Sequence, residues 1–197
     1  PTQKTELNKD EKIIQSIKGS LNKLTDKNYD TMSKNIFEDL SKLESSDKFN
    51  YVNTIIFNIA SSNRFYSVIY ANLFSDLIEK YDLFKNYINE AMSSYLERFN
   101  HILDINPNDD YDLFCDENKK NEEQKALTEF IVNLNKQGVI EIDRLVTLFE
   151  DMFDLVLKYK VEAKYKSRII ELSENIFILL NSGFEGFQNI NAWSNIL

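Results

Sequence analysis

Glycine, proline and cysteine are scarce in this 197-residue chain, which has 4 Gly, 2 Pro and 1 Cys. Such low counts argue against tight-turned β-sandwiches, Gly-rich phosphate loops and collagen-like or disordered classes. The single cysteine, Cys115, excludes an internal disulfide and a Cys-pair metal site, and it fits a reducing compartment. No run approaches the roughly 18 apolar residues of a membrane span, and the start lacks a signal-peptide core. We therefore expect a cytoplasmic protein, and a chain that begins with Pro1 instead of Met suggests an excised fragment.

Positive charge is also in deficit. The chain has 32 acidic against 23 basic residues, a formal net charge of −9, and only a few of the bases are arginine. Nonspecific binders of nucleic acid usually have a pI above about 9, so this balance argues against that class. The 43% of apolar residues is enough to form the core of one domain, residues 1–197.

Apolar residues recur at helical spacing along most of the chain. Eight apolar stripes predict eight helices, with stripes over residues 13–24, 29–43, 49–59, 65–78, 83–102, 127–134, 145–156 and 169–180. We expect the fifth helix to run to about Leu103 and Gly138 to end the sixth. The polar stretch 104–123, which contains Pro107, reads as an acidic loop. Gly183 and Gly186 should break the chain, and residues 183–197 read as a tail or the start of a further repeat.

The predicted helices group into antiparallel pairs that start near residues 10, 47, 83 and 141. A period of about 37–40 residues is typical of helical-hairpin solenoids. The sequence therefore predicts an all-α, HEAT-type solenoid of about four antiparallel helix pairs, with a globular helical bundle as the alternative.

Residue patterns typical of catalysis or metal binding are weak. The only histidine, His101, falls near a predicted helix end, where a solvated or capping role is ordinary. Residues 104–110 begin like a calcium loop, but the required Gly position is Asp109 and the bidentate Glu position is Cys115. No phosphate-loop or dinucleotide-binding motif occurs. We expect no enzymatic activity, no metal and no cofactor.

Lysines gather near the connection between the last two predicted helices. They are candidate RNA contacts, with Tyr159 and Tyr165 available to stack on bases: Lys158, Lys160, Lys164 and Lys166. The alternative is that this segment is simply a solubilising connection.

Three segments resemble a known family. Residues 17–25 read Ile-Lys-Gly-Ser-Leu-Asn-Lys-Leu-Thr, and residues 55–73 contain Arg-Phe-Tyr-Ser-Val-Ile-Tyr-Ala-Asn-Leu. Residues 129–134 read Glu-Phe-Ile-Val-Asn-Leu. In place and order, these segments resemble the middle domain of eukaryotic translation initiation factor 4G, a HEAT-repeat fold, over roughly residues 10–182. We expect a divergent or viral member of that family.

The spacing of these segments separates packing residues from exposed ones. Leu21 and Leu24 belong to an apolar stripe, whereas Asn22 and Lys23 should face outward. In the second segment, the apolar residues are spaced for burial between helix pairs: Phe65, Val68, Ile69 and Leu73.

The resemblance implies a translation initiation scaffold that binds a DEAD-box RNA helicase of the factor 4A type. In this family the domain holds the helicase's two lobes half-open and promotes its active conformation, with the first repeats on the C-terminal lobe. Carried over by position, the partner-binding residues are Asn22, Lys23, Thr25, Arg64 and Phe65. A cap-binding protein would attach through sequence outside this chain. The alternatives are a middle-domain scaffold in mRNA decay, splicing or cap-binding complexes, and a direct RNA-binding module.

The chain departs from the family pattern at two places. Relatives carry an Arg-rich run before the third segment, whereas residues 117–125 here mix lysines with glutamates. Together with the net charge of −9, this predicts that RNA is bound weakly or indirectly. Relatives also continue into a fifth helix pair, of which residues 183–197 would be only the beginning.

Overall fold

All regular secondary structure is helical in residues 9–43 and 45–188, the parts of the chain that the computed structural model describes. The prediction of an all-α protein is confirmed for these residues. Two 3-10 helices, Asp26–Asn28 and Ala163–Tyr165, directly precede α2 and α9. The α-helices are α1 (Lys9–Lys23), α2 (Tyr29–Ser41), α3 (Ser46–Ser61), α4 (Ser67–Lys80), α5 (Phe84–Ser94), α6 (Glu97–Asn100), α7 (Tyr111–Lys136), α8 (Ile142–Tyr159) and α9 (Lys166–Gln188). Among these helices, none is both long enough and apolar enough to cross a bilayer.

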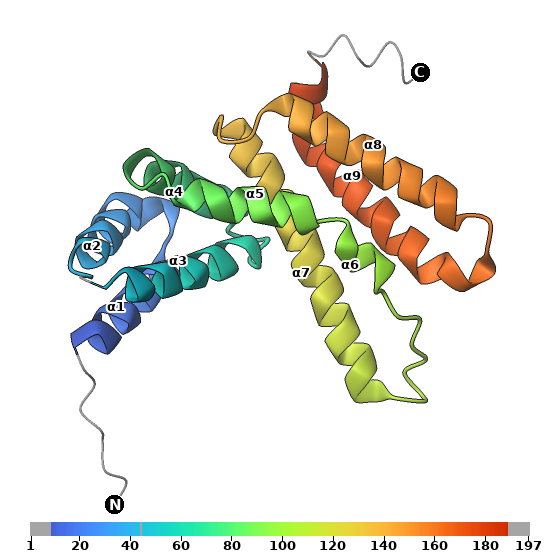
Figure 1. Cartoon of the computed structure of the whole chain (residues 1–197), viewed down its shortest axis with the longest axis horizontal. Coiled ribbons are helices and arrows are strands. Elements are labelled where there is room, and N and C mark those ends of the chain that lie inside the picture. Colours follow the sequence, from blue (N-terminus) through green and yellow to red (C-terminus); the bar gives the residue numbers. More distant parts are fainter. Residues whose placement is uncertain (1–8, 44, 189–197) are drawn as a thin grey trace, which may run out of the picture.

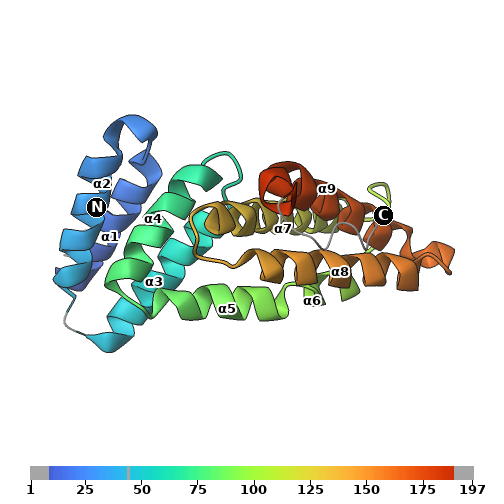
Figure 2. The same ribbon diagram turned by 90° about the horizontal axis from the view of Figure 1, so that it is seen from above.

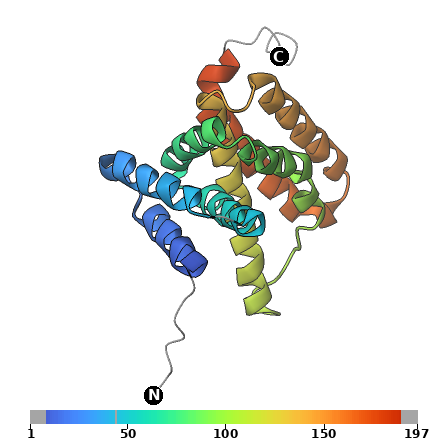
Figure 3. The ribbon, with the colours of Figure 1, turned by 60° about the vertical axis from the view of Figure 1, so that its left-hand side comes forward.

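Most of the helices stack side by side in two rows, and within a row each helix contacts the next. In one row α2 contacts α4, α4 contacts α7 and α7 contacts α9, while in the other α1 contacts α3 and α3 contacts α5. The helices α1 to α4 stand side by side at one end, and α5, α7, α8 and α9 run along the length of the molecule (Figure 2). The long helix α7 lies between α3 and α4 on one side and α8 and α9 on the other, and it contacts all four (Figures 1 and 3). The helix direction therefore turns sharply between the second pair and the helices that follow.

One continuous apolar core joins the two groups of helices. Phe74 of α4 lies at its centre, with its ring edge-to-face against Phe84 of α5 at 5.3 Å and Phe130 of α7 at 5.4 Å between centroids. All three rings are fully buried. Aromatic pairs in this geometry contribute about 0.5–1.5 kcal/mol beyond the area they bury. This cluster holds α4, α5 and α7 together at the turn in helix direction.

The prediction of a loop over residues 104–123 is wrong in its second half, because α7 begins at Tyr111. Asp110 caps the helix, since its Oδ1 accepts a hydrogen bond from the Leu113 N–H at 2.9 Å. The polar residues that interrupt the apolar periodicity do not all face water. Glu117 and Asn121 are buried and turn toward Arg98. A helix that buries polar side chains carries no apolar stripe by which it could be recognised.

The fifth predicted helix is broken into α5 and α6 around Tyr95 and Leu96. The hydroxyls of Ser93 and Ser94 donate to the backbone carbonyls of Asn89 and Glu90, at 2.8 and 2.9 Å. Such back-bonds compete with the helix ladder and often bend it. The break turns α6 toward α9, which it contacts.

Gly138 ends α7, whereas Gly183 and Gly186 lie within α9. Gly138 adopts φ +74, and the Gly138 and Val139 N–H groups donate to the carbonyls of Asn135 and Leu134, closing α7 as predicted. In contrast, α9 runs through Gly183 and Gly186 to Gln188, so the prediction that these glycines break the chain is wrong. A helical glycine costs about 1 kcal/mol relative to alanine, and the packing of α9 against α7 and α8 outweighs this cost. The remaining predicted tail, residues 189–197, lies outside the described residues.

Candidate functional site

The turn between α1 and α2 presents the first set of predicted partner-binding residues. Asn22 and Lys23 are exposed at the end of α1, as the spacing predicts, and Thr25 is half-buried. The Thr25 N–H donates to Asn28 Oδ1 at 2.7 Å, and Asn28 Nδ2 donates to the Lys23 carbonyl at 2.8 Å. The side chain of Asn28 therefore fixes the turn and holds Asn22 and Lys23 toward solvent.

The turn between α3 and α4 presents the second set. Its shape is set by the Ser62 hydroxyl, which donates to the Asn58 carbonyl at 2.6 Å, and by Asn63 Oδ1, which accepts from the Tyr66 N–H at 3.3 Å. Arg64 lies 3.9 Å from a carboxylate oxygen of Glu129 on α7. At that distance and with half of the Arg64 side chain exposed, the pair contributes little to stability, so Arg64 is free to contact a partner.

The structure brings the two turns to one edge of the molecule. The Tyr70 hydroxyl, in the first turn of α4, donates to the Leu21 carbonyl in the last turn of α1 at 3.1 Å. Tyr70 is buried, and its burial raises the pKa of the phenol above its ordinary value. Both turns lie along the upper edge of the first two helix pairs in Figure 2. The predicted partner-binding residues therefore share one edge, which we call the α1–α4 edge.

Phe65 is the most prominent apolar group of this edge, with 87% of its surface exposed. Val68 is 56% exposed, so the predicted burial of Phe65 and Val68 is wrong, whereas Ile69 and Leu73 are buried as expected. The difference arises because α4 begins only at Ser67, which leaves Phe65 in the turn. Its ring lies edge-to-face against the neighbouring Tyr66, with centroids 5.0 Å apart.

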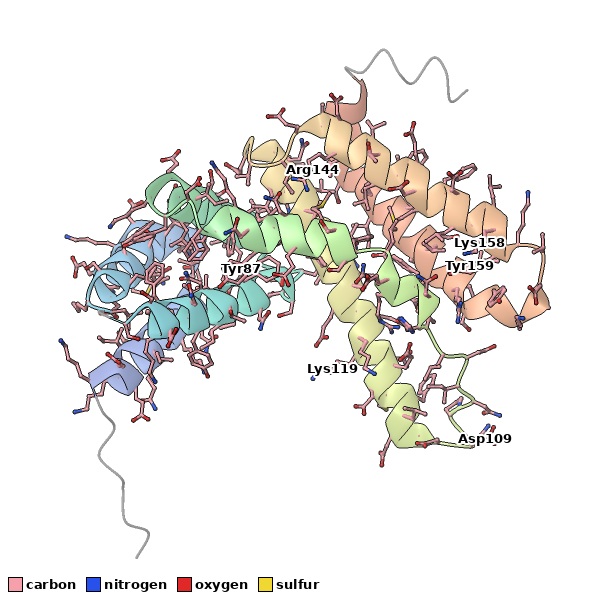
Figure 4. All side chains as sticks on the ribbon, viewed as in Figure 1. Tyr87, Asp109, Lys119, Arg144, Lys158 and Tyr159 are labelled. Carbon is pink, nitrogen blue, oxygen red and sulfur yellow. The ribbon has the colours of Figure 1, made fainter. Side chains whose placement is uncertain are left out.

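The four candidate RNA-contacting lysines lie together at the turn between α8 and α9. All four are exposed: Lys158, Lys160, Lys164 and Lys166. Lys164 is paired with Glu162 at 2.6 Å. This turn lies at the opposite end of the molecule from the α1–α4 edge (Figures 1 and 4).

The two tyrosines of this turn are not available to stack on bases, contrary to the prediction. Tyr159 is 3% exposed, and its hydroxyl donates to Asn100 Oδ1 at 2.5 Å. Its ring lies 4.9 Å from that of Tyr165, and the Arg168 guanidinium lies about 5 Å from both rings. These rings therefore hold the turn against the rest of the molecule.

A buried polar network between α6 and α7 is a feature that the sequence did not reveal. Arg98 Nη2 donates to Glu117 Oε1 at 2.6 Å and to Asn121 Oδ1 at 2.7 Å. The Leu103 N–H also donates to Glu117, at 3.1 Å. Glu117 is 4% exposed, so the loss of Arg98 would leave an uncompensated buried charge. The sequence gives only a weak signal for this network, because Arg98 lies 19 residues before the glutamate that it binds.

A second network joins α7 to α9. The Thr128 hydroxyl donates to Asn175 Oδ1 and lies within hydrogen-bond distance of the Tyr95 hydroxyl, each at 2.5 Å. Lys125 contacts Glu122, Glu171 and Glu174. Burial by itself lowers the pKa of Lys125, but the hydrogen bonds and charges of these carboxylates outweigh it and raise the pKa above its ordinary value. Both networks fix the packing of α7, and neither opens a reactive group to solvent.

The remaining sequence candidates occupy ordinary positions. His101 is exposed just after α6, and Cys115 is exposed on α7. In the segment that begins like a calcium loop, Asn106 accepts from the Asn108 N–H and Asp110 caps α7. Within residues 9–43 and 45–188, no group of three or more His, Cys, Asp or Glu side chains is placed to hold a metal ion.

No protein-family model matches the chain, and no curated protein matches it significantly.

Proposed function

We propose that this chain is a HEAT-type scaffold that binds a DEAD-box RNA helicase of the initiation factor 4A type through its α1–α4 edge. The proposal combines the sequence resemblance with one observation. The residues that the resemblance assigns to the helicase lie in two turns that a buried hydrogen bond from Tyr70 to Leu21 holds on one edge. The stacked rows of helices are compatible with a HEAT-type solenoid.

Phe65 would provide most of the affinity. Burial of a fully exposed phenylalanine side chain contributes about 1.5–3 kcal/mol, and each 1.4 kcal/mol is a tenfold change in Kd. Lys23 and Arg64 would add charge complementarity toward an acidic surface and set the orientation. The mechanism would be conformational. A scaffold that binds the active state of the helicase more tightly than the inactive state shifts the helicase toward the active state, and the size of the shift equals that difference in binding free energy.

The test is a calorimetric titration of a purified factor 4A-type helicase with matched variants. We expect Phe65→Ala to weaken binding by about 10–100-fold, and Lys23→Glu with Arg64→Glu to weaken it by a similar factor. The matched controls are Tyr51→Ala, an exposed aromatic on α3, and Lys34→Glu with Lys136→Glu, an equal charge change elsewhere. Circular dichroism should be unchanged in every variant. Equal affinity of the edge variants and the controls would refute the proposal.

The lysines of the α8–α9 turn support direct RNA binding as a second candidate function, because they place several exposed cations on one surface. Contacts there would be to phosphates, since Tyr159 and Tyr165 are already engaged. Gel-shift titrations at several salt concentrations test this function. A steep salt slope that Lys158→Glu with Lys166→Glu reduces would support it, and a slope unchanged by these substitutions would exclude this turn as the RNA site.

A further inference from the structure

A groove runs between α3, α5, α6 and α7, away from the lysines of the α8–α9 turn. It consists of two adjoining hollows with volumes of about 690 and 490 Å³. The two hollows share the lining residues Asn58, Arg98, Gln124 and Leu127, so they form one continuous depression. The break between α5 and α6 lies at this groove, because Ser94, Tyr95 and Glu97 on either side of the break line the larger hollow.

The floor of the groove is apolar and firmly held. Phe57 and Tyr87 stack with ring centroids 5.9 Å apart and an angle of 26° between the planes. The Tyr87 hydroxyl donates to the Asn50 carbonyl at 3.1 Å, which ties α5 to α3 (Figure 4). Phe57 and Leu127 are half-buried, so each keeps apolar surface exposed toward the groove. A side chain of moderate size could cover that surface without displacing the walls.

The rim of the groove is negatively charged. Glu90, Glu97 and Glu123 line it and are exposed, and none of them forms an ion pair with another described residue. Of the two basic side chains that line the groove, Arg98 is held by Glu117 at 2.6 Å, whereas Lys120 lies 3.9 Å from Glu117 and is about half exposed. The three carboxylates of the rim therefore outnumber the one cation that could offset them. A groove of one charge sign attracts ligands of the opposite sign.

We infer that this groove is a docking site for a basic peptide segment of a partner protein. Lysine or arginine side chains of the segment would pair with the three rim carboxylates, and a leucine or phenylalanine would cover the Phe57–Leu127 floor. An apolar floor surrounded by a polar rim matches the ordinary anatomy of a protein–protein interface. Nucleic acid is excluded as the occupant, since its phosphates would face Glu90, Glu97 and Glu123.

The chain offers a closely matched pair of variants to test this inference. Ser93 and Ser94 are adjacent, both are exposed, and both donate to the carbonyl four residues earlier, but only Ser94 lines the groove. Ser94→Trp would fill the groove, whereas Ser93→Trp would place the same ring outside it. The probe is a fluorescein-labelled lysine–leucine peptide of about 12 residues, measured by fluorescence anisotropy beside a peptide with glutamate at each lysine.

We expect the basic peptide to bind with a Kd of about 10–100 μM and the acidic peptide not to bind. Both substitutions remove a back-bond of α5, but only Ser94→Trp also fills the groove. Ser94→Trp should therefore weaken binding at least about tenfold more than Ser93→Trp does. Neutralising the three rim carboxylates should weaken binding far more than neutralising three exposed carboxylates of α8, an equal change of net charge. The rim variant is Glu90→Gln with Glu97→Gln and Glu123→Gln. The α8 variant is Glu150→Gln with Asp151→Asn and Asp154→Asn. Equal effects of the two serine variants, or of the two charge variants, would show attraction to the acidic protein as a whole and overturn the inference. The helicase is absent from this experiment, so its outcome is independent of the proposed function.

Discussion

Polar side chains that are buried between helices distinguish this core from a purely apolar one. Glu117, Thr128 and Asn175 are each buried with hydrogen-bond partners on another helix. Buried polar groups with partners cost little, whereas those without partners lose the full free energy of solvation. The residues in these networks therefore fix which helices pack together, and the exceptions identify positions where stability can be gained.

Asn53 on α3 is such an exception, because it is fully buried and both side-chain amide atoms lack a hydrogen-bond partner. Replacing both unsatisfied atoms by apolar groups of similar shape should remove a desolvation cost of about 1–3 kcal/mol. We predict that Asn53→Leu raises the free energy of unfolding by that amount in urea denaturation. Asn50→Leu, an exposed position on the same helix, should change it by less than about 0.5 kcal/mol. A loss of stability in Asn53→Leu would contradict the prediction.

The buried phenol of Tyr95 makes the free energy of unfolding depend on pH in the alkaline range. Burial raises the pKa of its phenol well above the ordinary 10.0, and the hydrogen bonds with Thr128 and Gln124 only partly oppose this. The folded protein therefore holds this proton where the unfolded chain has lost it, so the stabilisation is complete below pH 10.0 and falls as the pH rises above it. We predict a loss of about 1.4 kcal/mol per pH unit from this group. Denaturation series should show a shallower decline in Tyr95→Phe, and an unchanged one in the exposed control Tyr51→Phe.

At the scale of the element, the sequence predicted the helices with apolar stripes and missed those without them. The helices α1 to α4, α8 and most of α9 follow from their spacing, and Gly138 correctly marked the end of α7. The first half of α7 was missed because its inward-facing residues, Glu117 and Asn121, are polar. Their partner Arg98 lies on another helix, so no local pattern could show that they are buried. The break between α5 and α6 was also missed. The apolar stripe continues across it, and the back-bonds of Ser93 and Ser94 that accompany it are seen only in the structure.

The start of α7 gives a test at this scale. Asp110 Oδ1 accepts from the Leu113 N–H, whereas Asp109 is exposed and precedes the capping position. We predict that Asp110→Ala costs about 1 kcal/mol of stability and speeds hydrogen exchange in residues 113–116. Asp109→Ala should do neither. Rapid exchange of these amides in the unsubstituted protein would instead mean that this segment is a loop.

For the molecule as a whole, function was the part least accessible from sequence. The motif residues Asn22, Lys23, Arg64 and Phe65 were selected by resemblance, and the structure brings them to one edge. It also separates that edge from the basic turn at the other end (Figure 1). The net charge of −9 opposes nonspecific attraction of the chain to nucleic acid.

The most direct measurement is an amide NMR titration of this protein with the C-terminal lobe of a factor 4A-type helicase. We predict that the shifted signals are those of residues 21–28 and 62–70, while those of the α8–α9 turn stay in place. The same signals should shift far less with Phe65→Ala at equal concentrations. Absence of any shift, or shifts confined to residues outside the α1–α4 edge, would contradict the assignment of this edge as the helicase-binding site.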